Sequence, residues 1–105
     1  MDDIPRLAYT LQGEAGICGF WAMVAIAYVF TTGRNTTFYG WQTPSEMAVY
    51  VAQNYFYYPD PTPDARYVFS RSDLQRPAVQ RIIENRGPPL QVFRCKGGLE
   101  LHFFA

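Results

Sequence analysis

An uncharged, almost wholly apolar run from Cys18 to Phe30 constrains the fold more than any other stretch of this chain. The run is too short to cross a bilayer, because a membrane span needs about 20 apolar residues. A helix that is apolar on every side has to be buried on every side. The run therefore predicts a central helix with Cys18 in its first turn, and Gly33 is the expected C-cap.

A cysteine at the start of a helix is a candidate nucleophile. The first N–H groups of a helix are unpaired and the helix dipole adds partial positive charge, so a thiol there loses its proton more easily. Gly13, Gly16 and Gly19 surround Cys18 and would let a substrate backbone approach closely. The Gln12 side chain, six residues before Cys18, is a candidate oxyanion donor together with the Cys18 N–H.

The order Gln12-Gly-x-x-Gly-x-Cys18-Gly, followed by an apolar helix with Ala22-Met23 and Tyr28, resembles the active-site entry of papain-like cysteine peptidases. It is closest to the C39-like branch, which includes bacteriocin-processing peptidases. The small size of the chain also resembles papain-fold toxin domains of bacterial effectors. The resemblance covers both ends of the chain and is weak between about residues 35 and 75.

This resemblance implies roles for three residues. Cys18 would be the nucleophile, Gln12 would stabilise the oxyanion, and His102, the single histidine, would be the general base. Papain-like enzymes hold the imidazole with an Asn or Asp that follows the histidine, whereas Phe103, Phe104 and Ala105 follow His102 here. An orienting group would have to come from elsewhere, such as Glu100, the terminal carboxylate or another subunit.

The remaining elements predict an α+β fold in a single domain, residues 1–105, with a papain-like, Cys-bearing central helix packed on a small antiparallel sheet that carries His102. The first half of the chain predicts an extended entry at 1–11, a polar connection at 34–42, a helix begun by Thr43-Pro44 and ending near Asn54, and a proline-rich loop at 55–63. The second half predicts a strand at 66–70, a capping box at 72–75, a helix that has Pro77 in its first turn and runs to Asn85, and a hairpin of 90–95 with 99–105. We expect 99–105 to be an exposed edge strand that pairs with a second copy or a partner chain.

Composition narrows the function classes. Nine basic and nine acidic residues give a net charge of zero, so nucleic acid is not an expected partner. The sequence predicts no membrane span, no cofactor and no metal site. The acidic start Met1-Asp-Asp3 is unlike a secretory signal, so we expect a protein that is cytoplasmic in the producing cell or delivered as an effector. Cys95 is expected to be buried, with pairing to Cys18 as the alternative.

The sequence supports a cysteine-dependent amide hydrolase, either a protease or a glutamine deamidase, that acts on peptide or protein substrates through a Cys18–His102 dyad and a thioester. Two alternatives remain open. One is a non-catalytic papain-like module that binds a peptide or a partner subunit. The other is an unrelated α+β domain in which Cys18 belongs to the core.

Overall fold

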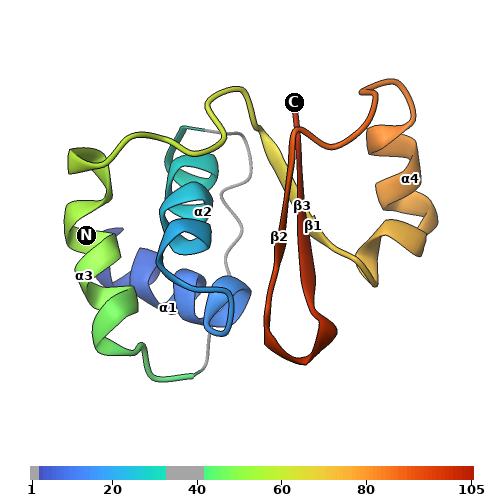
Figure 1. Cartoon of the computed structure of the whole chain (residues 1–105). Helices are drawn as coiled ribbons and strands as arrows, with labels where there is room; N and C mark the ends of the chain where they lie inside the picture. The colour runs from blue at the N-terminus through green and yellow to red at the C-terminus, as the bar shows by residue number, and fades with distance from the viewer. Residues whose placement is uncertain (1–2, 33–41) are drawn as a thin grey trace.

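The computed structural model describes residues 3–32 and 42–105, and it is an α+β protein with four α-helices and one three-stranded antiparallel sheet in those ranges. The sheet stands between two helical layers, with three helices on one face and one helix on the other (Figure 1). The helices are α1 (Asp3–Ala15), α2 (Phe20–Thr32), α3 (Glu46–Asn54) and α4 (Pro77–Ile83). The strands are β1 (Tyr67–Ser70), β2 (Gln91–Arg94) and β3 (Glu100–Phe104).

The first helix corrects the prediction of an extended entry segment at 1–11. Leu7, Tyr9 and Leu11 alternate in the sequence, but the buried apolar residues of α1 are Ala8, Leu11 and Ala15. Their spacing of three and four residues is that of a helix face, and this periodicity decides the structure. Gln12 therefore lies in a helix and not in a loop.

The apolar run forms the central helix, as predicted, but the helix begins later than expected. Seven residues of α2 are buried, and α2 packs against both α1 and α3. Gly19 has a φ of +90°, and its carbonyl accepts the Met23 N–H, so the helix begins after Gly19. Cys18 consequently lies in the turn before α2 and not in its first turn. The predicted C-cap Gly33, and nearly all of the predicted connection at 34–42, lie outside the described residues.

The other predicted helices are present with shifted boundaries. Helix α3 begins after Ser45, whose hydroxyl accepts the Ala48 N–H at 3.1 Å, and not after Thr43. It ends at Asn54, as predicted. Helix α4 begins at Pro77, which agrees with the prediction that Pro77 lies in the first turn, and it ends at Ile83, before the predicted end at Asn85. The capping box predicted at residues 72–75 is instead a short 3-10 turn without a side-chain cap.

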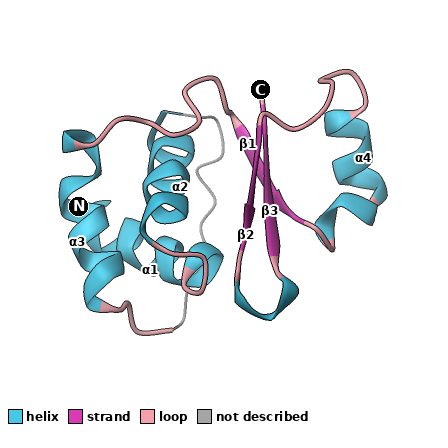
Figure 2. Ribbon diagram, in the orientation of Figure 1, coloured by secondary structure: helices cyan, strands magenta, loops and turns pink. Residues whose placement is uncertain are grey.

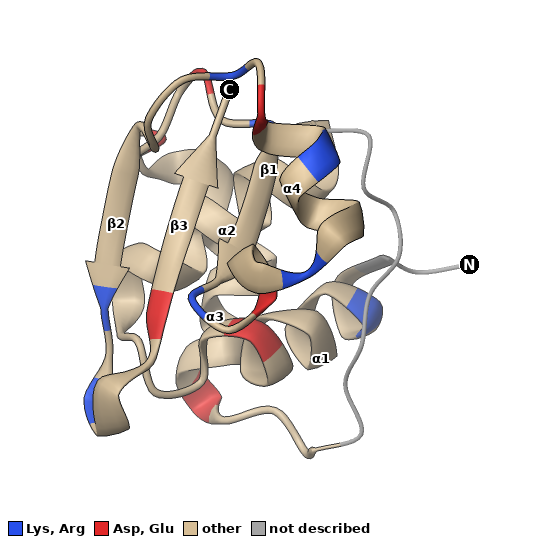
Figure 3. Cartoon of the chain, turned by 90° about the vertical axis from the view of Figure 1, so that its right-hand side faces the viewer, with Lys and Arg blue, Asp and Glu red and all other residues tan. Residues whose placement is uncertain are grey.

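The strand and hairpin predictions are confirmed, whereas the prediction of an exposed edge strand is wrong. Figure 2 shows the three strands nearly edge-on between the helices, and Figure 3 shows β3 lying between β2 and β1. The strand order is β1-β3-β2, so β3 is the central strand and pairs on both sides. Pairing of residues 99–105 with another chain would require β1 or β2 to leave the sheet. The edges of this sheet are formed by β1 and β2.

The alternation of β3 defines the two faces of the sheet. Leu101 and Phe103 are buried in the core with the residues of α2, and Phe93 of β2 packs against the same core. Glu100 and His102 point to the opposite face, because successive side chains of a strand alternate. Phe104 is buried on this second face, where its ring contacts Phe69 of β1.

Candidate functional site

The predicted nucleophile is joined to the second cysteine of the chain. Cys18 and Cys95 form a disulfide with a Cα–Cα distance of 4.3 Å, so neither residue carries a free thiol in this structure. The alternative in which Cys95 pairs with Cys18 is therefore the one observed. The bond links the turn before α2 to the residue that follows β2, and the backbone adds a bond from the Lys96 N–H to the Ile17 carbonyl.

The histidine lies on the other face of the sheet from this disulfide. Cys95 follows β2 in alternation with Phe93, so it faces the helices α1–α3, and both cysteines pack against the main core. His102 is paired with Val92 and with Phe69 across the sheet and faces the α4 side. The structure therefore separates Cys18 from His102 by the thickness of the sheet and does not assemble the predicted dyad.

The third predicted residue also has a structural partner. Gln12 Oε1 accepts a hydrogen bond from the Ser45 N–H at 2.9 Å, which ties α1 to the start of α3. The Gln12 side chain lies close against Gly16, where an added Cβ would come within 2.5 Å of Gln12 Nε2. The predicted role of Gln12 as an oxyanion donor remains a prediction, because in this arrangement its amide supports the helix pair.

The histidine does have an orienting carboxylate. His102 Nε2 lies 3.1 Å from Glu100 Oε1, although side chains two residues apart on a strand ordinarily run in parallel. Arg94 Nε lies 3.4 Å from the other Glu100 oxygen. The hydrogen bond with His102, and then the nearby Arg71 and Arg94 charges, hold the pKa of Glu100 below its usual value. The sequence contained this pair, but its contact depended on rotamers that spacing does not set.

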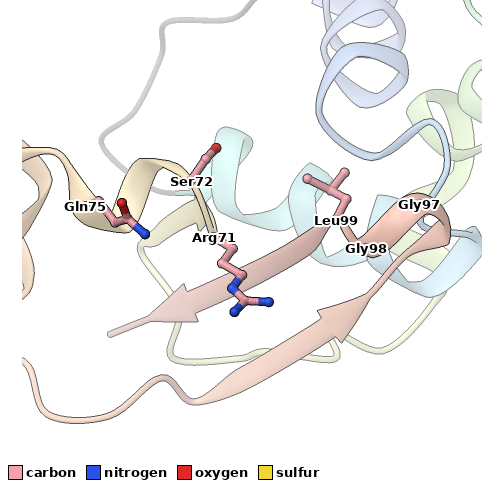
Figure 4. Close-up of a pocket in the computed structure, with 6 residues that line it drawn as sticks. All are labelled: Arg71, Ser72, Gln75, Gly97, Gly98 and Leu99. Carbon is pink, nitrogen blue, oxygen red and sulfur yellow. The ribbon is translucent and has the colours of Figure 1, made fainter.

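A cross-strand row of charges surrounds this pair. Glu100 lies between Arg94 of β2 and Arg71, whose N–H bonds the Glu100 carbonyl and continues the β1–β3 ladder. Figure 3 shows basic and acidic positions close together at the hairpin end of the sheet. Beside them lies a cavity of about 400 Å³ lined by Arg71, Ser72, Gln75, Gly97, Gly98 and Leu99 (Figure 4). Sequence reasoning missed this site, since its residues come from segments far apart in the chain.

A second feature is an aromatic cluster formed by Phe20, Trp21, Tyr50 and Tyr58. The Phe20 ring centroid lies 5.1 Å from that of Trp21 and 5.0 Å from that of Tyr58, both edge to face. The Tyr50 and Tyr58 hydroxyls share a hydrogen bond, which raises the pKa of Tyr58. Trp21 and Tyr50 remain 47% and 46% exposed, so a surface of aromatic rings faces solvent at the start of α2 and along α3.

Comparisons with protein-family models, with curated proteins and with solved structures found no match to this chain. The structure itself assigns the protein to the α+β class, with four helices and a small antiparallel sheet in its described ranges. No helix among the described residues is long and apolar enough to cross a membrane. Within the same ranges, no group of three His, Cys, Asp or Glu residues is placed to hold a metal ion.

Proposed function

We propose that this chain is a non-catalytic binding module, and that its aromatic cluster binds an extended, proline-containing peptide segment of a partner protein. The observation that carries this proposal is the position of the predicted catalytic residues. The Cys18 sulfur is bonded to Cys95, and His102 is held by Glu100 on the opposite face of the sheet. A thioester mechanism needs a free thiolate within reach of its base, and neither condition is met in this arrangement.

The cluster has the chemistry that proline-containing peptides require. Peptides in the polyproline conformation dock on aromatic-lined surfaces, where flat rings pack on the pyrrolidine rings and hydroxyl or indole groups bond the peptide carbonyls. The half-exposed Trp21 and Tyr50 offer both an apolar face and a polar tip. The chain places its own proline segment, Pro59 to Pro63, directly after Tyr58 of this cluster.

The disulfide bears on where the module would act. Disulfides persist in oxidising surroundings, and thiols in the cytosol are kept reduced. Of the two expected localisations, the disulfide favours a chain that is delivered out of the producing cell and works in its oxidised form. The amide-hydrolase hypothesis stays a prediction for the reduced chain, in which the Cys18 thiol would be free.

A direct binding experiment tests the module. A fluorescein-labelled proline decamer is titrated with the oxidised chain, and anisotropy is expected to rise to saturation. Trp21→Ala should abolish the rise. Tyr57→Ala is the matched control, because the Tyr57 side chain is 76% exposed and its ring contacts Phe56 and not the cluster. Absence of saturable binding, or equal loss in both variants, would contradict the proposal.

Iodoacetamide labelling distinguishes the binding-module hypothesis from the hydrolase hypothesis. The oxidised chain should take up no label. After reduction at pH 6, equal and slow labelling of Cys18 and Cys95 is the result expected for a binding module. Much faster labelling of Cys18, together with hydrolysis of peptide or glutamine substrates that Cys18→Ala removes, would favour the hydrolase instead.

A further inference from the structure

The cavity at the hairpin end of the sheet has the features of an anion site. It is bounded on one side by the segment after β1, with Arg71, Ser72 and Gln75, and on the other by the turn between β2 and β3 (Figure 4). It is a shallow pocket that is largely open to solvent, and its volume of about 400 Å³ is near the lower end of the roughly 300–1,000 Å³ of pockets that bind small ligands. Its walls offer a guanidinium, a hydroxyl and an amide as donors, with Leu99 as an apolar surface.

Arg71 is the residue of this cavity that is best suited to bind an anion. Its guanidinium makes no hydrogen bond or ion pair within 4 Å to the residues that the structure describes, and Figure 4 draws it extending over the hairpin. By contrast, the guanidinium of Arg94 lies against Glu100, and that of Arg76 lies 3.6 Å from Asp73. Arg71 therefore keeps its planar set of donors available, and such a set matches the two oxygens of a carboxylate or phosphate.

The neighbouring acid does not neutralise the site. Glu100 is engaged by His102 through one oxygen and by Arg94 through the other. Lys96 begins the turn that forms the far wall. Two cationic side chains, Arg71 and Arg94, thus lie near the Glu100 carboxylate, which is already bonded, and their positive charges favour a negatively charged ligand.

The turn also brings its backbone close to the cavity. Gly97 and Gly98 have φ values of +72° and +80°, which side-chain-bearing residues rarely adopt, and both line the cavity. A Cβ added at either position would meet no atom within 4 Å. These positions therefore favour glycine because of their backbone conformation and not because of internal packing. Their lack of side chains leaves the wall open to a ligand.

From these features we infer that the cavity binds a small ligand with an oxyanion group, a carboxylate or a phosphate, attached to a compact apolar body. The oxyanion lies on the Arg71 guanidinium, and the apolar body lies along the wall of the cavity. This site is separate from the aromatic cluster, so it does not depend on the peptide-binding proposal.

The test uses phenyl phosphate and benzoate as probes, with benzyl alcohol as the uncharged match. The folded, oxidised chain is titrated while its amide resonances are followed by NMR. We expect saturable shifts of the Gly97 and Gly98 amides with one or both anions and none with benzyl alcohol. Binding of phenyl phosphate alone would assign the site to phosphates, and binding of benzoate alone would assign it to carboxylates.

Two variants that each lose one positive charge test whether anion binding depends on the cavity or on the overall charge of the protein. Arg71→Gln should weaken binding by about 10- to 100-fold, as expected for loss of a hydrogen bond to a charged group. Arg66→Gln removes the same charge from an exposed residue at the opposite end of β1 and should leave affinity unchanged. Equal weakening in both variants, or an absence of saturable shifts with either anion, would overturn the inference.

Discussion

Breaking the disulfide should cost this chain a large part of its stability. Cys18 and Cys95 are 77 residues apart in sequence, so the bond closes a loop over most of the chain. In the chain-entropy model such a loop lowers the free energy of folding by about 4.5 kcal/mol at 25 °C. A domain of this size has a free energy of unfolding of roughly 5–15 kcal/mol in total. The bond also joins the helical layer to the hairpin, so its loss should loosen the packing of Phe93 on the core.

The assay is urea denaturation, followed by far-UV circular dichroism, of the oxidised chain, the reduced chain and the variants Cys18→Ala, Cys95→Ala and the double variant. With a urea m value of about 1.5 kcal/mol/M, the midpoint should fall by about 3 M. Either single substitution should cost as much as both together, since each breaks the same bond, and the two effects should not add. A loss below about 1 kcal/mol, or single effects that sum to the double, would refute this reasoning.

Three further outcomes follow from local contacts. Because the pKa of Glu100 is lowered by its hydrogen bond with His102, the stability from this pair is present above the ordinary carboxyl pKa of 4.5 and is lost as the pH falls. The melting temperature of Glu100→Gln should therefore fall less on acidification than that of the parent chain. Ser45→Ala removes the N-cap of α3 and should lower the free energy of unfolding by about 1 kcal/mol in urea titrations, whereas an unchanged value would mean that the cap is replaced by water. Burial, and then the nearby Asp73, raises the pKa of Glu14, so Glu14→Gln should raise the melting temperature at pH 7 and have little effect at pH 4, and a destabilised variant at pH 7 would contradict this.

Local patterns determined much of the secondary structure. The apolar run at 18–30 predicted α2, because a segment without polar side chains has to be buried. Pro77 marked the start of α4 by its fixed φ, and the Lys96-Gly97-Gly98 turn marked the hairpin of β2 and β3. Near the N-terminus the same local reading was wrong, since Leu7, Tyr9 and Leu11 fit a strand while Ala8, Leu11 and Ala15 fit a helix face. Two periodicities competed there, and the burial of alanines against α2 and α3 decided between them.

The sequence by itself determined an α+β chain with one buried helix and a C-terminal hairpin, because hydrophobic periodicity and turn residues act over a few neighbouring positions. Only the tertiary structure decided which residues meet. It placed β1 on the free side of β3, which made β3 central, and it joined Cys18 to Cys95 across 77 residues. It also left His102 on the face of the sheet opposite the cysteines. These outcomes depend on how separate elements pack and on which face each strand presents, and sequence spacing carries no information about contacts between distant segments.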